Sequence, residues 1–232
     1  MSELLDNSID AHGGAKRWDA FLTVQATIGT GGALWGMKGL FQDPHPREMT
    51  VSLHEERASG MPFGAENQRT AFTPDRIAIE TTNGRVVAKL ANPRQSFEGH
   101  GMTTPWNPLH RAYFNGLRSG PISRHPFLKM PGVRIQELAP WTEGSEVWHR
   151  LRARFRAYLA THSEVQDFFF GPDLLVRRHD YEVEVAGRGV LRHNSWTTMR
   201  KCGTCTFRQG VGHTSGARTI GRSWIQFSSP SI

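Results

Sequence analysis

Short segments in which apolar and polar residues alternate recur along most of the chain, and glycine, proline and asparagine residues separate them. Such alternation is typical of β-strands that bury one face. The clearest pair covers 75–81 and 85–90, and the Asn83-Gly84 dipeptide between them favours a type I′ hairpin turn. The same pattern predicts further strands at 49–54, 133–138, 147–155, 165–170 and 174–185, with a turn at Gly171-Pro-Asp before the last one.

A second hairpin is predicted near the N-terminus. Alternating, branched residues occupy 21–28, the pattern breaks at Gly29-Thr-Gly-Gly, and it resumes at 33–38. We therefore expect two antiparallel strands here, joined by the glycine-rich turn.

Three segments have helical spacing instead. Residues 2–11 follow Ser2, a residue type that caps helices, and end at two glycines; one more helical turn is expected over 15–19. The segment 105–118 has an apolar stripe with Pro108 in its first turn. Because no βαβ alternation occurs, we predict an α+β domain that is mainly β, with this helix lying across an antiparallel sheet.

Composition and hydropathy place the chain among ordinary globular proteins. It has 232 residues, of which 38% are hydrophobic and 21% are charged. No run of about 18 apolar residues occurs, and the first residues lack a charged region followed by an apolar one. We therefore expect a cytoplasmic protein without a transmembrane segment.

The net charge of +7 is concentrated at the C-terminal end. Residues 188–232 contain seven Arg and Lys residues and no Asp or Glu, whereas 1–187 contain 21 basic and 21 acidic residues. We therefore divide the chain into a domain at 1–187 and a basic tail at 188–232, and we expect the tail to be disordered and to make few contacts with the domain.

Both cysteines, Cys202 and Cys205, lie in this tail. A basic arm can bind nucleic acid, and a Cys-x-x-Cys pair can contribute to a metal site if two more ligands come from elsewhere. Because only one such pair is present, a closed four-ligand zinc site is poorly supported. We expect no metal, no cofactor and no specific nucleic-acid partner.

Short motifs occur in a fixed order within residues 5–185 of the chain: Asp10-Ala-His-Gly-Gly-Ala-Lys-Arg-Trp18, Gly31-Gly-Ala-Leu-Trp35, Lys38-Gly39, Phe72-Thr-Pro-Asp-Arg76, Thr104-Pro-Trp106, Leu109-His110, Tyr113-Phe114, Ala160-Thr-His-Ser163 and Arg177-Arg-His-Asp-Tyr181. In this order they resemble bacterial proteins of the lipoprotein-carrier-like (LolA-like) half-barrel superfamily. The resemblance implies a strongly curved, incompletely closed antiparallel sheet, with helices across its concave face and an apolar cavity between them. In the lipoprotein carriers of this superfamily, that cavity holds acyl chains.

The resemblance also offers another explanation for the tail, namely translation out of frame. With suitable degenerate codons from Ser195 onward, a different frame encodes acidic residues and an alternating ending that resembles the usual end of the family. A frameshift would account together for the missing acids, the excess of basic residues and the clustered cysteines. It predicts an insertion or deletion near the Gly187 codon.

Aromatic residues are more numerous than strand pairing requires, so we expect some of them to line a site for an apolar small molecule or lipid. The alternative is that they only fill the core. The predicted ligand-binding residues are Trp35, Phe63, Trp106, His110, Tyr113, Phe114, Phe127 and Trp148.

Two other functions are weighed against ligand binding. An enzyme would need convergent polar groups such as His12, His110 and His162, but no metalloprotease, nucleophile-elbow or phosphate-loop motif occurs, so we predict no catalytic residue. Anion binding would use the arginines at 150, 152, 154 and 156, which a strand places on one face. The simpler interpretation is an outer face paired with carboxylates on the next strand.

Overall fold

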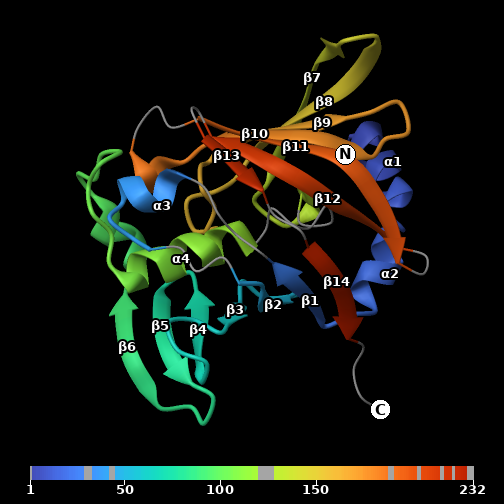
Figure 1. Cartoon of the computed structure of the whole chain (residues 1–232). Helices are drawn as coiled ribbons and strands as arrows, with labels where there is room; N and C mark the ends of the chain where they lie inside the picture. Colours follow the sequence, from blue (N-terminus) through green and yellow to red (C-terminus); the bar gives the residue numbers. More distant parts are fainter. Residues whose placement is uncertain are drawn as a thin grey trace.

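The computed structural model describes residues 2–28, 33–41, 45–119, 128–187, 191–202, 205–214, 217–220 and 223–228, and its strands form two antiparallel sheets (Figure 1). The first sheet has seven strands in the order β14-β1-β2-β3-β4-β5-β6. Their bounds are β1 (Thr23–Ile28), β2 (Arg47–Ser52), β3 (Ala58–Met61), β4 (Gln68–Thr73), β5 (Arg76–Thr81), β6 (Val86–Ala91) and β14 (Ser223–Ser228).

The second sheet also has seven strands, in the order β13-β12-β11-β10-β9-β8-β7. Their bounds are β7 (Arg134–Glu143), β8 (Glu146–Arg154), β9 (Val165–Phe170), β10 (Val176–Glu182), β11 (Leu191–Cys202), β12 (Cys205–Thr214) and β13 (Ala217–Ile220). In Figure 1 the β7–β8 hairpin extends away from the rest of the molecule.

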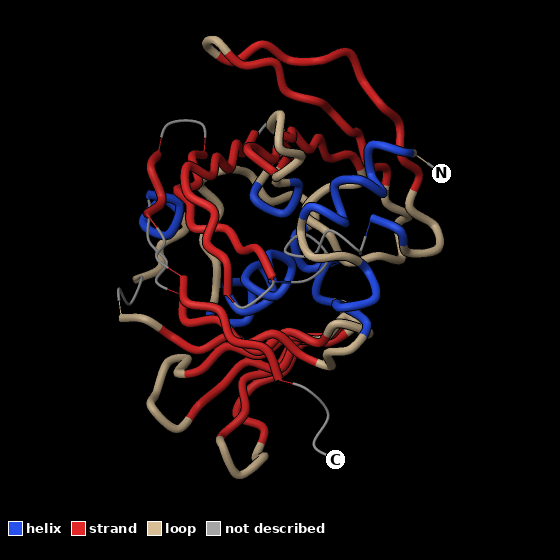
Figure 2. Tube along the Cα trace, turned by 90° about the vertical axis from the view of Figure 1, so that its right-hand side faces the viewer, coloured by secondary structure: helices blue, strands red, loops and turns tan. Residues whose placement is uncertain are grey.

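The two sheets meet where the chain passes from β13 to β14, because each of these strands is the outermost one of its sheet. At the opposite ends β6 and β7 are also outermost, and the pairings of the described strands do not join them. The strands therefore form a bent, incompletely closed antiparallel arrangement with the helices inside it (Figure 2). This confirms the prediction of a mainly β, curved fold.

The helices and 3₁₀ turns are α1 (Glu3–Ala11), α2 (Ala15–Asp19), α3 (Ala33–Met37), η1 (Pro93–Phe97), α4 (Pro108–Ser119) and η4 (Glu184–Ala186). α1 begins as predicted, since the Ser2 hydroxyl accepts a hydrogen bond from the Leu5 amide at 3.3 Å. α4 has a reciprocal cap: the Asn107 side chain accepts from the His110 amide at 2.9 Å, and His110 Nδ1 accepts from the Asn107 amide at 3.2 Å.

Two local predictions were wrong. The segment 33–38 is not a strand, because the Lys38 amide donates to the Leu34 carbonyl at 3.0 Å and closes a short helix. The Asn83-Gly84 hairpin exists but its turn is not type I′: only Gly84 has a positive φ, 87°, and the Thr81 amide donates to the Arg85 carbonyl at 2.9 Å. That pattern belongs to a three-residue loop with a glycine bulge.

The segment predicted as a separate basic tail contributes strands to both sheets. β11 pairs with β10 from Arg178↔Ser195 to Glu182↔Leu191, and β14 pairs with β1 from Thr23↔Ser228 to Ile28↔Ser223. Without these partners β10 and β1 would each expose a row of unpaired backbone groups. The segment therefore supplies the strands that join the two sheets. The frameshift itself stays a prediction, testable by sequencing the genomic DNA near the Gly187 codon.

The main core lies between α4 and the concave face of the first sheet. The helix contacts β3, β4, β5 and β6, and its residues Tyr113, Phe114 and Leu117 are almost completely buried. Gly116 permits this close approach, since a Cβ atom there would lie 2.2 Å from Phe72 Cδ2 on β4. The predicted helix across the sheet is thus confirmed, including Pro108 in its first turn.

A second apolar cluster lies under α1, where Leu5 and Ile9 pack against Leu151 and Phe168 of the second sheet. Stacked rings join it to the main core: Phe168 lies 4.3 Å from His179, and His179 lies 4.6 Å from Tyr181. The domain thus has one continuous interior.

Candidate functional site

Five of the predicted ligand-binding residues come together in the main core. Trp35, Phe63, Trp106, Tyr113 and Phe114 are each at most 5% exposed and belong to one cluster. Trp35 lies 5.6 Å from Phe114, and Trp106 lies 5.3 Å from Phe114, measured between ring centroids. The rings pack directly against one another, as in an ordinary protein interior.

The other three predicted residues lie elsewhere. His110 is half-buried at the start of α4, with its ring 4.8 Å from Phe97. Trp148 lies on the β7–β8 hairpin opposite Trp141 and donates to Glu146 at 2.7 Å, so it is not part of the core cluster. Phe127 lies outside the described residues.

The least expected residue of the core is Lys38, which is completely buried. Its ammonium group donates to the carbonyl of Gly101 at 2.6 Å and to the carbonyl of Ala186 at 3.0 Å, and it lies 4.7 Å from the centroid of the Trp106 ring. Burial lowers the Lys38 pKa to about 8, because the charged form loses its hydration. Lys38 thereby connects the end of α3 to η4 and to the loop that follows η1.

Two histidines share the electrostatic environment of Lys38. The His100 and His110 rings lie 5.3 Å apart, and His100 is 5.5 Å from Phe97. Burial lowers the pKa of both histidines, and the positive charge of Lys38 lowers it further. At neutral pH both rings are therefore uncharged.

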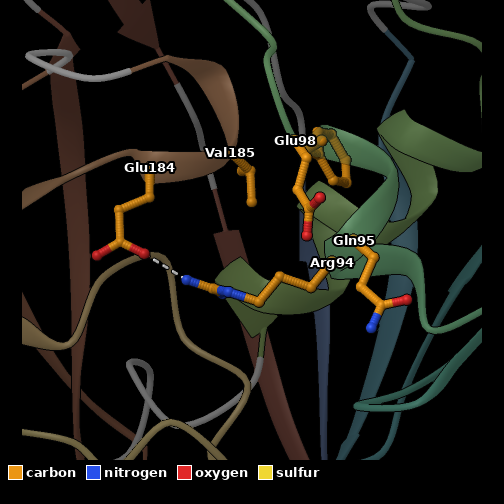
Figure 3. A pocket seen from close by; sticks show the side chains of 6 residues that line it. Arg94, Gln95, Glu98, Glu184 and Val185 are labelled. Carbon is orange, nitrogen blue, oxygen red and sulfur yellow. Dashed lines mark hydrogen bonds and ion pairs between the residues drawn. The ribbon is translucent and has the colours of Figure 1, made fainter.

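An open pocket of about 290 Å³ lies next to this group, between η1 and η4 (Figure 3). Its apolar surface comes from Phe97 and Val185, and its lining is completed by Arg94, Gln95, Glu98 and Glu184. Arg94 pairs with Glu184 across the pocket and donates to the Thr161 carbonyl at 2.7 Å. The pocket therefore lies at the seam between η1, which follows β6 of the first sheet, and η4, which follows β10 of the second sheet.

The three histidines of the enzyme alternative do not form one cluster. His12 Nδ1 contacts the Ser8 carbonyl within α1 at 2.7 Å, whereas His162 stacks between Phe114 at 4.8 Å and Tyr181 at 5.2 Å. His110 contacts Phe97 and His100 instead. In the part of the chain that the structure describes, no three His, Cys, Asp or Glu side chains are grouped as metal ligands.

Two arginines of the predicted stripe, Arg150 and Arg152, pair with a carboxylate on the next strand. Arg152 makes two hydrogen bonds to Asp167 on the neighbouring strand β9, at 2.7 and 2.8 Å, and Arg150 approaches the same carboxylate at 3.3 Å. Leu151 and Ala153 between them are completely buried. Arg150 and Arg152 therefore occupy the outer face of the sheet.

Sequence reasoning missed Lys38, Arg94, Phe97 and His100. Lys38-Gly39 is among the motifs that resemble the superfamily, but no spacing indicated a buried ammonium group. Arg94, Phe97 and His100 follow β6 in a segment without helical or strand periodicity. Their importance depends on contacts with η4 and α3, which are distant in the sequence.

No helix among the described residues is long and apolar enough to cross a membrane. No protein-family model and no curated protein matches the sequence.

Solved structures do match the fold. A LolA superfamily protein from Nitrosomonas europaea has a TM-score of 0.57 at 9% identity, covering 98% of this chain and 93% of that one. A putative outer membrane lipoprotein-sorting protein domain from Vibrio parahaemolyticus has a TM-score of 0.57 at 10% identity, with 99% and 93% covered. A DUF1329 family protein from Desulfovibrio piger has a TM-score of 0.54 at 9% identity, with 99% and 93% covered. The chain therefore has the fold of the LolA superfamily.

Proposed function

We propose that this protein binds a ligand with an acyl or similar apolar chain between α4 and the concave face of its sheet, as a carrier-like protein rather than an enzyme. The observation that supports this most is the aromatic cluster around α4, which brings Trp35, Trp106, Tyr113 and Phe114 together. The fold shared with a lipoprotein-sorting domain supports it as well.

The apolar chain would enter at the seam between η1 and η4. Phe97 and Val185 already form an apolar surface there, and the Phe97 ring lies 5.4 Å from Trp106 inside the core. Separating the two segments requires the Arg94–Glu184 ion pair to break. Both of these side chains are more than a third exposed, so this costs little.

Burial of apolar chain supplies the binding free energy. Each methylene group contributes roughly 0.8 kcal/mol, so about ten buried methylenes give on the order of 8 kcal/mol before ordering costs. The rings in the core must move apart to admit the chain, which reduces this gain. Since about 8 kcal/mol corresponds to a dissociation constant of about 1 μM, we expect dissociation constants above this value once these costs are included.

The test titrates the full-length protein with 1-dodecanol by calorimetry. Wild type should show saturable binding. Phe114→Ala should weaken binding at least tenfold, because the Phe114 ring contacts both Trp35 and Trp106 in the cluster that would hold the ligand. Phe41→Ala is the matched control, since Phe41 is 83% exposed, and it should bind like wild type.

Phe114→Leu retains most of the buried volume and should fold normally with a smaller loss of affinity. Absence of saturable binding by wild type would contradict the proposal. So would a His162→Ala variant that abolishes binding while both Phe114 variants bind normally.

A further inference from the structure

The buried ammonium group of Lys38 has no negatively charged partner. Its contacts are two backbone carbonyls and the face of the Trp106 ring, and no carboxylate contacts it among the residues that the structure describes. Burying an unpaired charge is unfavourable by several kcal/mol, so such groups usually serve a purpose. Lys38 is 0% exposed, which rules out compensation by water at the surface.

The groups around Lys38 are also basic or neutral. His100 and His110 are the titratable side chains whose pKa values respond to the Lys38 charge, and no acid contributes to either shift. The potential in this part of the core is therefore positive. A positive region enclosed by apolar rings attracts anions strongly, because the surrounding low dielectric does not screen it.

Two hydrogen-bonding atoms in this group lack partners among the described residues. Trp106 Nε1 is buried within a side chain that is only 4% exposed, and His100 Nδ1 is buried as well. An indole nitrogen can only donate, and a histidine nitrogen can donate in one of its tautomers. Both atoms can therefore serve an acceptor that enters the site.

We propose that Lys38, Trp106 and His100 form a binding site for the acidic headgroup, a carboxylate, of the apolar ligand. The inference rests on the proposed function and adds the chemical class of the ligand: an acidic amphiphile such as a fatty acid. The carboxylate takes the place of the Gly101 carbonyl at the Lys38 ammonium group and accepts the unused hydrogen bonds.

The position of the site fits a ligand that enters at the seam. Gly101 is exposed, so a ligand that displaces its carbonyl from the Lys38 ammonium group can approach from the surface. Lys38 also bonds to Ala186, the residue after Val185 of the pocket. Phe97 lies between the pocket and Trp106, so the apolar chain and the headgroup would meet on either side of this ring.

The experiment compares dodecanoic acid with 1-dodecanol, which has the same chain and no charge, by calorimetry on the full-length protein at pH 7. Wild type should bind the acid at least tenfold more tightly, because the carboxylate forms a hydrogen-bonded charge pair with Lys38 that the alcohol cannot form. Lys38→Met should remove this preference, so that the variant binds the acid and the alcohol with equal affinity. Lys89→Met, on the exposed surface of β6, should keep the preference.

Trp106→Phe provides a second variant that keeps an aromatic ring in the core and removes only the indole N–H. It should reduce the preference for the acid several-fold. Equal affinity of wild type for acid and alcohol would overturn the inference but not the proposed function. A Lys38→Met variant that still prefers the acid would have the same consequence. Failure of wild type to bind either compound would overturn both.

Discussion

Cationic side chains lie against aromatic rings both in the core of this protein and on the outer face of its second sheet, but only the outer ones are neutralised. On the inner side Lys38 lies over Trp106 without a carboxylate partner in the described structure. On the outer face Arg150 and Arg178 both lie 5.0 Å from the centroid of Phe169. Phe168 and Phe169 are neighbours in β9 and point to opposite faces of the second sheet, so Phe168 contacts His179 in the interior while Phe169 contacts the arginines.

Carboxylates complete the outer group. Asp167 binds Arg150 and Arg152, while Asp180 makes two hydrogen bonds to Arg178 at 2.8 and 2.6 Å. The pKa of Arg178 is raised, mainly by its hydrogen bonds to Asp180. The charges and hydrogen bonds of these arginines are thus satisfied within the chain, and the arginines stabilise the fold. Lys38 has no such carboxylate among the described residues, which is why we assign ligand recognition to it.

The largest expected effect concerns Lys38 itself and appears as a function of pH. Its pKa is about 8 in the folded protein and 10.5 in the unfolded chain, so between these values only the unfolded chain holds the proton. Unfolding then requires proton uptake, and stability rises with pH. Relative to Lys38→Met, wild type should gain about 3 kcal/mol of unfolding free energy from pH 8 to 10.5.

Urea denaturation of both proteins across this range measures the gain. The loss of donors to Gly101 and Ala186 in the variant shifts the whole curve but does not depend on pH, so the slope reports the buried charge alone. Parallel curves for the two proteins would show that Lys38 is not desolvated, and the contrast between the core and the outer face would disappear.

A second, smaller effect tests how tightly the inner cluster is packed. Gly116→Ala places a methyl group 2.2 Å from the ring of Phe72, which is only 2% exposed. Overpacking of this kind costs about 1–3 kcal/mol. Gly36→Ala in α3 is the control, because its Cβ would meet nothing within 4 Å. Thermal melting should show a clear loss for Gly116→Ala and none for Gly36→Ala; equal melting temperatures would mean that the cluster is loosely packed.

The elements with a regular pattern could be predicted from the sequence. The capped, amphipathic segment around Pro108 forms α4 as expected, and the alternating segments form strands. The prediction of a strand at 33–38 was wrong because so short a segment with an apolar pattern fits a helix as well as a strand. The pairing of β14 with β1 could not be predicted, because the two strands lie near opposite ends of the chain.

The residues of the candidate site likewise include some that the sequence pattern could predict and some that it could not. Trp106, Tyr113 and Phe114 could be selected because they belong to a helix expected to cover the sheet. Trp148 was selected for its size alone, and the structure places it on the projecting hairpin. Lys38 could not be recognised, since its burial arises from Gly101 and Ala186, which lie 63 and 148 residues away in the chain.

The smallest expected effect on stability concerns Asp167, on the outer face of the second sheet. Asp167→Asn removes the charge that neutralises Arg150 and Arg152 while preserving the shape of the side chain. Asp167 is only 14% exposed, so the loss should be about 1–2 kcal/mol of unfolding free energy. Asp173→Asn is the matched control: its carboxylate also pairs with an arginine, Arg177, but is 48% exposed, and the loss should stay below about 0.5 kcal/mol. Binding of dodecanoic acid should not change in either variant, since Asp167 and Asp173 both lie outside the core. If Asp167→Asn weakened that binding as strongly as Lys38→Met, the arginines on the outer face and Lys38 in the core would act as one site. The distinction between neutralised arginines that stabilise the fold and an unneutralised lysine that binds ligand would then be wrong.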